Sequence, residues 1–170
     1  MLVELWRYMN DETQKAGLAA GLDFLTVSSV NPGGFQMGEQ CGATADGRKK
    51  GQPFAIGHAP TAGFDRNGVT ALGSSVAKAD PANGGATTSM KLSRALFTGS
   101  RAYLEALLRA YFALGGQQCS LTVVNRADLE AAIREPEKHG GLMVRSGGWC
   151  AKFVGLDATV QQEILRRTQY

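Results

Sequence analysis

The segment from Leu142 to Val154 places a glycine pair between two short apolar stretches, with an arginine before the pair and a tryptophan after it. Gly148 could carry a backbone radical. A radical on a glycine Cα can become planar and delocalise into both flanking amides, because glycine has no Cβ to crowd it. The apolar stretches would anchor such a loop in a dry interior, and Arg145 can bind loop carbonyls or a neighbouring carboxylate. The other interpretation is an ordinary Gly-Gly β-turn, which this segment alone favours because such turns are common.

Length and composition indicate one folded domain. The chain has 170 residues, of which 44% are hydrophobic and 19% charged, so we expect a packed core rather than disorder. The 18 Lys and Arg residues against 15 Asp and Glu give a net charge of +3, which is too even to indicate nucleic-acid binding. No apolar run reaches the roughly 18–20 residues of a membrane helix and no signal-peptide pattern opens the chain, so we expect a cytoplasmic protein.

Cysteine and histidine offer little for metal chemistry. Cys41, Cys119 and Cys150 are odd in number and form no CxxC pair, which argues against a disulfide framework and against a zinc site. Cys119 lies in an apolar run and is expected to pack in the core. His58 and His139 are expected on loops, where they leave little for metal binding or general-base catalysis.

The apolar periodicity predicts a mixed α/β chain with long loops. An N-terminal helix should carry one apolar stripe and end at Gly17 to Gly21, and residues 31–60 should be mostly irregular. Further helices are expected at 69–78, 104–112, 127–134 and after Asp157, which can cap the last of them. Strands are expected at 24–30, 86–92 and 120–124, with apolar arms at 142–144 and 151–154 around the glycine pair.

The glycine segment and several motifs before it resemble those of glycyl radical enzymes, the family of pyruvate formate-lyase and the anaerobic dehydratases. Arg145, Gly148 and Trp149 match the radical loop of that family, Arg-x-x-Gly-(Tyr/Phe/Trp), close to the C-terminal end. Each motif is weak by itself, but their order over nearly the whole chain is specific. Upstream, the matching segments are Ala43–Lys49 with Gly51-Gln52-Pro53, Ser75–Lys78, Ser89–Ser93, Gly115–Gln118, Asn125-Arg126 and Pro136–Lys138.

The resemblance implies an α/β fold, namely the C-terminal fragment of a ten-stranded glycyl radical enzyme barrel, ending in the glycyl radical loop and a final helix. Residues 1–100 would supply the last strands and helices of the barrel, and residues 101–170 the glycyl radical domain. Gly148 would carry the radical, with Arg145 and Trp149 supporting its loop. Trp149 would pack beside the glycine and fix the loop tip, or else pack in an ordinary core.

Two features depart from the family pattern. Ser146 and Gly147 should make the loop unusually flexible. Cys150 follows the radical glycine closely, either as a site of radical damage or oxidation or as a small buried residue.

Family members also hold a second loop, which faces the glycine and carries a cysteine whose thiyl radical attacks the substrate. That loop lies upstream of the region that this chain resembles, and none of the three cysteines has such a setting. The resemblance therefore implies a small subunit that is inactive alone and works with a larger barrel subunit carrying the cysteine loop. An activase with S-adenosylmethionine and an iron–sulfur cluster would generate the radical, while bound metal, nucleic acid and membrane are not expected. Dehydration, decarboxylation and C–C, C–N or C–S cleavage all stay open.

Three alternatives remain at this point. The first is a spare-part protein that repairs an oxygen-cleaved enzyme, although the chain reaches further upstream than a radical domain needs. The second is a non-catalytic domain that keeps the motifs as relics. The third is a truncation or piece of a full-length enzyme, although Met1 just before a helix favours a natural start.

The basic run Arg48–Lys50 is expected to be a solvated turn rather than an anion-binding site.

Overall fold

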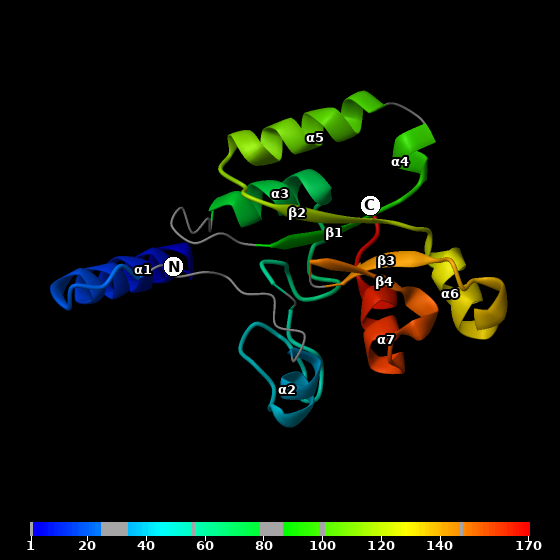
Figure 1. Cartoon of the computed structure of the whole chain (residues 1–170), viewed down its shortest axis with the longest axis horizontal. Coiled ribbons are helices and arrows are strands. Elements are labelled where there is room, and N and C mark those ends of the chain that lie inside the picture. Colours follow the sequence, from blue (N-terminus) through cyan, green and yellow to red (C-terminus); the bar gives the residue numbers. More distant parts are fainter. Residues whose placement is uncertain (1, 25–33, 56, 79–86, 99–100, 147) are drawn as a thin grey trace.

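The computed structural model describes residues 2–24, 34–55, 57–78, 87–98, 101–146 and 148–170. Over these residues the chain is mixed α/β, as the sequence predicts (Figure 1). The elements in chain order are α1 (Leu2–Ala19), α2 (Gly34–Gln40), α3 (Val69–Lys78), β1 (Thr88–Leu92), α4 (Ala95–Thr98), α5 (Arg101–Ala113), β2 (Cys119–Val123), α6 (Arg126–Arg134), a 3-10 helix η1 (Pro136–Lys138), β3 (Met143–Ser146), β4 (Trp149–Lys152), a second 3-10 helix η2 (Phe153–Gly155) and α7 (Ala158–Arg166).

The first core forms around a parallel pair of strands. β1 and β2 pair from Thr88 opposite Cys119 to Leu92 opposite Val123. Parallel strands need a crossover between them, and here α4 and α5 provide it while α3 packs beside α5 (Figure 1). The buried members of this cluster are Leu72, Met90, Leu92 and Tyr111. Cys119 packs against the same cluster, as the sequence predicts.

The second core holds the glycine segment. β3 and β4 form an antiparallel hairpin, and α6, η2 and α7 pack with it on the other side of the β1–β2 pair from α5 (Figure 1). The buried side chains shared by these elements are Val124, Leu129, Ala132, Val144, Phe153, Ile164 and Leu165. Val144 and Phe153, one from each predicted apolar arm, are buried in this core, whereas Gly148 between the arms is exposed rather than held in a dry interior.

The end of the chain returns to the first core. The backbone N–H of Tyr170 donates to the carbonyl of Lys91 at 3.0 Å, and the N–H of Ser93 donates to the carbonyl of Tyr170 at 2.5 Å. Gln169 forms an isolated parallel bridge with Lys91, so the last residues lie beside β1 (Figure 1).

The N-terminal helix α1 ends at Ala19, within the predicted stretch from Gly17 to Gly21, and Gly21 turns the chain with φ +71°. Residues 31–60 are mostly irregular where the structure describes them, as predicted, except that residues 34–40 form α2, which packs on the distant segment 52–54. A Cβ on Gly38 would collide with the carbonyl oxygen of Gln52, so this approach requires glycine. The strand expected at 24–30 lies outside the described residues except for Phe24, which is not in a strand.

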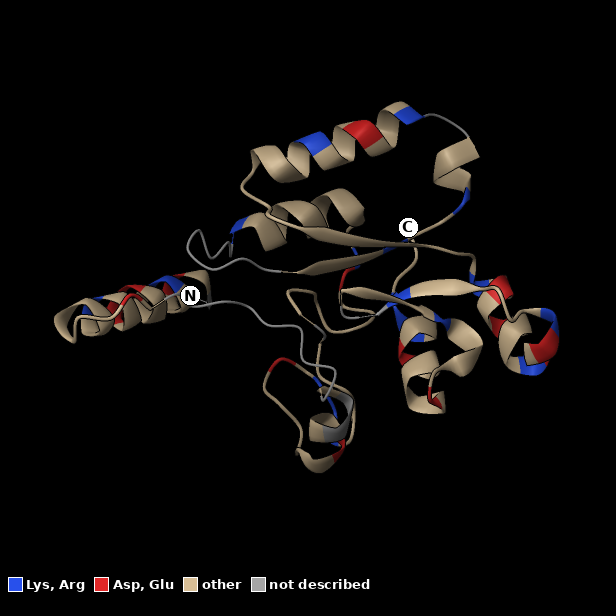
Figure 2. Cartoon of the chain, viewed as in Figure 1, with Lys and Arg blue, Asp and Glu red and all other residues tan. Residues whose placement is uncertain are grey.

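α1 extends away from both cores (Figure 1). It leaves several large apolar side chains exposed, namely Leu5, Tyr8, Met9 and Leu18. Acidic and basic residues are interspersed on α1, α5 and α6 rather than gathered by sign (Figure 2). Among the helices that the structure describes, none combines the length and the apolarity that crossing a membrane demands.

Candidate functional site

Gly148 lies in the turn of the β3–β4 hairpin. Ser146 pairs with Trp149 and Arg145 pairs with Cys150, so Gly148 lies between the paired ends of the two strands. Gly148 has φ +98°, in the left-handed region where a side chain is strained. The backbone conformation at position 148 is therefore by itself a sufficient reason for a glycine there.

The tip of the hairpin faces away from both cores. Trp149 is 56% exposed, and Gly148 and Cys150 are exposed as well. Apart from the chain neighbours of Gly148, none of the described residues places an atom within 4 Å of the position that a Cβ on Gly148 would occupy. The interpretations of Trp149 as a core residue and of Cys150 as a buried residue are thus wrong, because both residues point outward from the two cores that the chain itself forms.

Arg145 contacts the hairpin through both its side chain and its backbone. Its Nη1 lies 3.2 Å from Sγ of Cys150 on the opposite strand, and among the described residues the guanidinium has no carbonyl or carboxylate partner. Its backbone N–H donates to Oγ1 of Thr122 at 3.1 Å, and its carbonyl accepts from Nη1 of Arg167 at 3.3 Å. The base of the hairpin is therefore held from β2 and from the residue that follows α7.

Arg48 is buried, and the prediction of a solvated basic turn is wrong for this residue. Its side chain is only 2% exposed. The guanidinium donates to the carbonyls of Gly38, Gly42, Lys49 and Gln52 and lies 4.3 Å from the ring centroid of Phe54. Arg48 thus closes the loop between α2 and residue 54, whereas Lys49 and Lys50 are exposed as expected.

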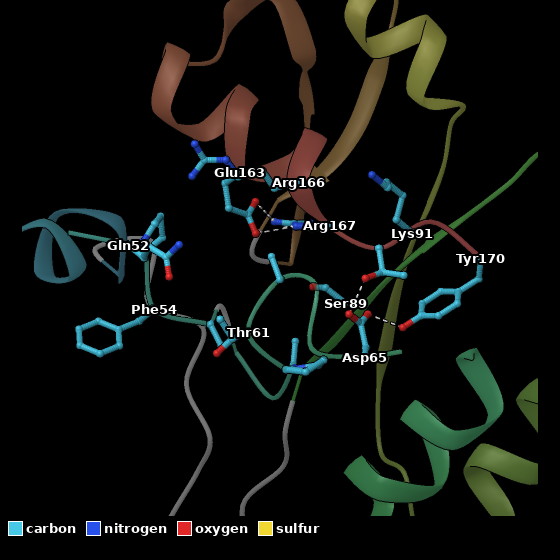
Figure 3. A pocket seen from close by; sticks show the side chains of 16 residues that line it. Gln52, Phe54, Thr61, Asp65, Ser89, Lys91, Glu163, Arg166, Arg167 and Tyr170 are labelled. Atoms are coloured by element: carbon cyan, nitrogen blue, oxygen red, sulfur yellow. Dashed lines mark hydrogen bonds and ion pairs between the residues drawn. The ribbon is translucent and has the colours of Figure 1, made fainter. Parts of the chain in front are cut away.

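A cavity of about 250 Å³ lies between the 52–65 segment, β1 and the C-terminal residues (Figure 3). Asp65, which lines the cavity, accepts hydrogen bonds from the hydroxyls of Thr168 and Tyr170. Burial and the hydrogen bond from Tyr170 to Asp65 raise the pKa of Tyr170 above its usual range. None of Arg145, Gly148 and Trp149 lines this cavity, so it is separate from the hairpin tip.

Lys91 lies beside this cavity and is 2% exposed. Its Nζ donates to the carbonyls of Ile164 and Leu165 in the last turn of α7, at 3.2 Å each. Burial, together with the nearby cations Arg126 and Arg167, lowers the pKa of Lys91 to about 8. In the sequence Lys91 stands out only as part of the Ser89–Ser93 motif; its position between Met90 and Leu92 in a strand is the signal of its burial.

The thiols and imidazoles do not assemble a metal centre in the part of the chain that the structure describes: no group of three His, Cys, Asp or Glu side chains there could hold an ion. Cys41, Cys119 and Cys150 are all free. Burial raises the pKa of the Cys119 thiol, which favours its neutral form.

Comparison with known proteins identifies relatives over almost the full chain. A family model described as glycine radical matches residues 54–154. The chain is 33% identical to a probable dehydratase, YbiW, of Escherichia coli over 98% of this chain and 21% of that protein. It is also 33% identical to trans-4-hydroxy-L-proline dehydratase of Clostridioides difficile, over 95% of this chain and 21% of the relative. The chain therefore spans about a fifth of the length of the relatives that it matches.

Solved structures agree with this match. Hydroxyproline dehydratase from Clostridioides difficile superposes with a TM-score of 0.86 at 27% identity, over 98% of this chain and 21% of that chain. The B12-independent glycerol dehydratase from Clostridium butyricum superposes with a TM-score of 0.79 at 34% identity, over 88% of this chain and 20% of that one. The chain thus has the fold of a C-terminal fragment of a glycyl radical enzyme barrel.

Proposed function

Because this chain belongs to the glycyl radical enzyme family, we propose that it is the radical-bearing small subunit of a split enzyme and that Gly148 stores the radical. The observation that carries the proposal is the hairpin itself. Gly148 has a backbone conformation that favours glycine, its arms are anchored in a core, and its tip faces outward. A tip of this kind suits insertion into a cavity formed by another part of an enzyme.

The chemistry proposed for Gly148 is reversible transfer of a hydrogen atom. An activase that uses S-adenosylmethionine and an iron–sulfur cluster removes one hydrogen atom from Cα, leaving one unpaired electron shared with the flanking amides. In turnover, Cα takes a hydrogen atom from a cysteine thiol of the larger chain, and the resulting thiyl radical attacks the substrate. The hydrogen atom returns to sulfur when the product leaves, which restores the glycyl radical. The reaction class is an anaerobic radical lyase or dehydratase.

The need for a larger partner is supported by two observations. The chain corresponds to about a fifth of its relatives, and Trp149, Cys150 and the apolar side chains of α1 are exposed. Exposed apolar surface of this kind marks protein contacts. We expect this chain to copurify with a chain that carries a cysteine-loop barrel. Enzymatic activity is expected only in the combined preparation.

Electron paramagnetic resonance after anaerobic activation tests the radical. We expect a doublet from the wild-type chain and its loss in Gly148→Ala, which removes one of the two Cα hydrogens and strains the turn by roughly 1–2 kcal/mol at this φ. Gly155→Ala is the matched control, since Gly155 lies just after the hairpin with open space at its Cα and without a positive φ. A wild-type chain that stays silent with a competent activase contradicts the proposal and favours a relic domain.

A further inference from the structure

The tip of the Gly148 hairpin makes few contacts with its own chain, so its position depends on how the base is held. Val144 and Phe153 anchor the apolar side of the arms in the second core. The polar side of the base is the backbone of Arg145, three residues before the glycine. Two side chains from distant parts of the sequence bind this backbone.

The first of them is Arg167, just after α7. Its Nε donates to Oε1 of Glu163 at 2.8 Å, and its Nη2 lies 2.7 Å from Oε2 of the same carboxylate, an ion-pair contact without hydrogen-bond geometry. Both side chains are nearly buried, with 12% and 11% exposed. A guanidinium fixed on a carboxylate in this way has its remaining N–H groups aimed in a set direction. Nη1 is aimed at the carbonyl of Arg145, 3.3 Å away.

The second is Thr122 on β2, which is buried. Its Oγ1 accepts from the N–H of Arg145 at 3.1 Å and donates weakly to the carbonyl of the same residue at 3.5 Å. The carbonyl of Arg145 thus has two side-chain partners, one from β2 and one from the residue after α7. These contacts join the hairpin base to β2 in the first core and to α7 in the second.

We propose that Arg167, fixed by Glu163, and Thr122 are positioning residues for the Gly148 hairpin. They hold the backbone of Arg145, and thereby set where the Cα of Gly148 lies relative to both cores. The positioning itself follows from the contacts above. Its consequence for radical storage rests on the function proposed for Gly148. A loose hairpin would present Cα poorly to an activase and to a partner thiol, where small displacements cost rate.

Amide hydrogen exchange of the full chain tests the positioning without any radical. In Arg167→Met we expect peptides covering 143–152 to exchange about tenfold faster, the effect of losing one hydrogen bond to a charged group. Arg166→Met is the matched control, because Arg166 is the exposed neighbour in α7. Unchanged exchange of the hairpin in Arg167→Met overturns the proposal, and so does faster exchange spread evenly over α6, β2 and α7, which would mean general destabilisation.

Milder variants keep the test sharp if Arg167→Met unfolds. Arg167→Lys keeps the charge beside Glu163 but lacks the fork that reaches Arg145, and Thr122→Val keeps the shape while removing the hydroxyl. We expect both to speed exchange of the hairpin by severalfold while the unfolding temperature changes little. Hairpin exchange equal to wild type in both variants overturns the proposal.

Radical measurements separate this inference from the proposed function. If activated wild type gives the glycyl doublet, its yield per folded chain should fall at least about threefold in Arg167→Lys and stay unchanged in Arg166→Lys. Equal yields overturn the link between positioning and radical storage. If wild type gives no doublet, the proposed function of Gly148 fails, and the exchange experiment still decides whether Arg167 and Thr122 position the hairpin.

Discussion

Arg48 illustrates, at the scale of single residues, why the type of a cation matters as much as its charge. Its guanidinium is buried among four backbone carbonyls and one aromatic ring. The planar fork of arginine reaches several acceptors at once, whereas a lysine ammonium is a single point with three donors. The loop between α2 and residue 54 is therefore built around this side chain.

We expect Arg48→Lys to lower the free energy of unfolding by about 2–3 kcal/mol, because several carbonyls would stay buried without their donors. Arg66→Lys is the control: Arg66 also contacts one carbonyl and a phenylalanine ring, but on an exposed turn. That change should cost less than about 0.5 kcal/mol. Denaturant unfolding of both variants measures the difference, and equal losses would show that Arg48 does not organise the loop.

At the scale of elements, Lys91 connects β1 with the end of α7. The final carbonyls of a helix lack partners within the helix, and here Lys91 donates to two of them. Its pKa of about 8 lies below the ordinary value of 10.5, so between these values the folded chain releases a proton that the unfolded chain keeps. Stability due to this group therefore rises with pH across that window and is flat below it. The neutral amine retains two N–H groups, enough for both carbonyls.

The pH dependence of unfolding checks this account. Between pH 7 and pH 9.5, the free energy of unfolding of wild type should increase, relative to that of Lys91→Met, by on the order of 1 kcal/mol. Lys78→Met, which removes an exposed lysine from α3, should give no such divergence from wild type. Parallel pH profiles for wild type and Lys91→Met would mean that Lys91 keeps its usual pKa.

At the scale of the whole molecule, the chain consists of two modest cores and an α1 helix that extends from them (Figure 1). Leu5 and Met9, one turn apart on α1, are 54% and 52% exposed. Apolar side chains at this spacing form a stripe suited to packing against another element. The homologous match to hydroxyproline dehydratase covers 98% of this chain, so it includes the region of α1.

For the proposed complex, we expect Leu5→Glu to reduce copurification of the larger barrel chain by roughly tenfold, since it places a charge in an apolar contact. Gln14→Glu adds the same charge on the opposite side of α1 and should leave binding unchanged. Circular dichroism should show equal helix content in both variants. Equal recovery of the partner with Leu5→Glu would exclude this face of α1 from the interface.

Much of the architecture was predictable from local sequence. Apolar periodicity and glycine breaks located α3, α5, α6 and α7, and alternation with β-branched residues located β1 and β2. The order of short motifs identified the family, because those motifs are read along the chain and need no contacts. The same sequence also placed the glycine pair between its two strands.

Contacts between distant residues decided the rest. α2 forms because Gly38 packs on residues 52–54, and Arg48 is buried because carbonyls from both sides of its loop converge on it. Arg167 and Thr122 meet Arg145 from 22 and 23 positions away in the sequence. The sequence by itself determined the elements, the family and the glycine turn, since these depend on local geometry. Only the tertiary structure decided which polar groups are buried and which side chains hold the hairpin, because burial depends on what the folded chain brings together.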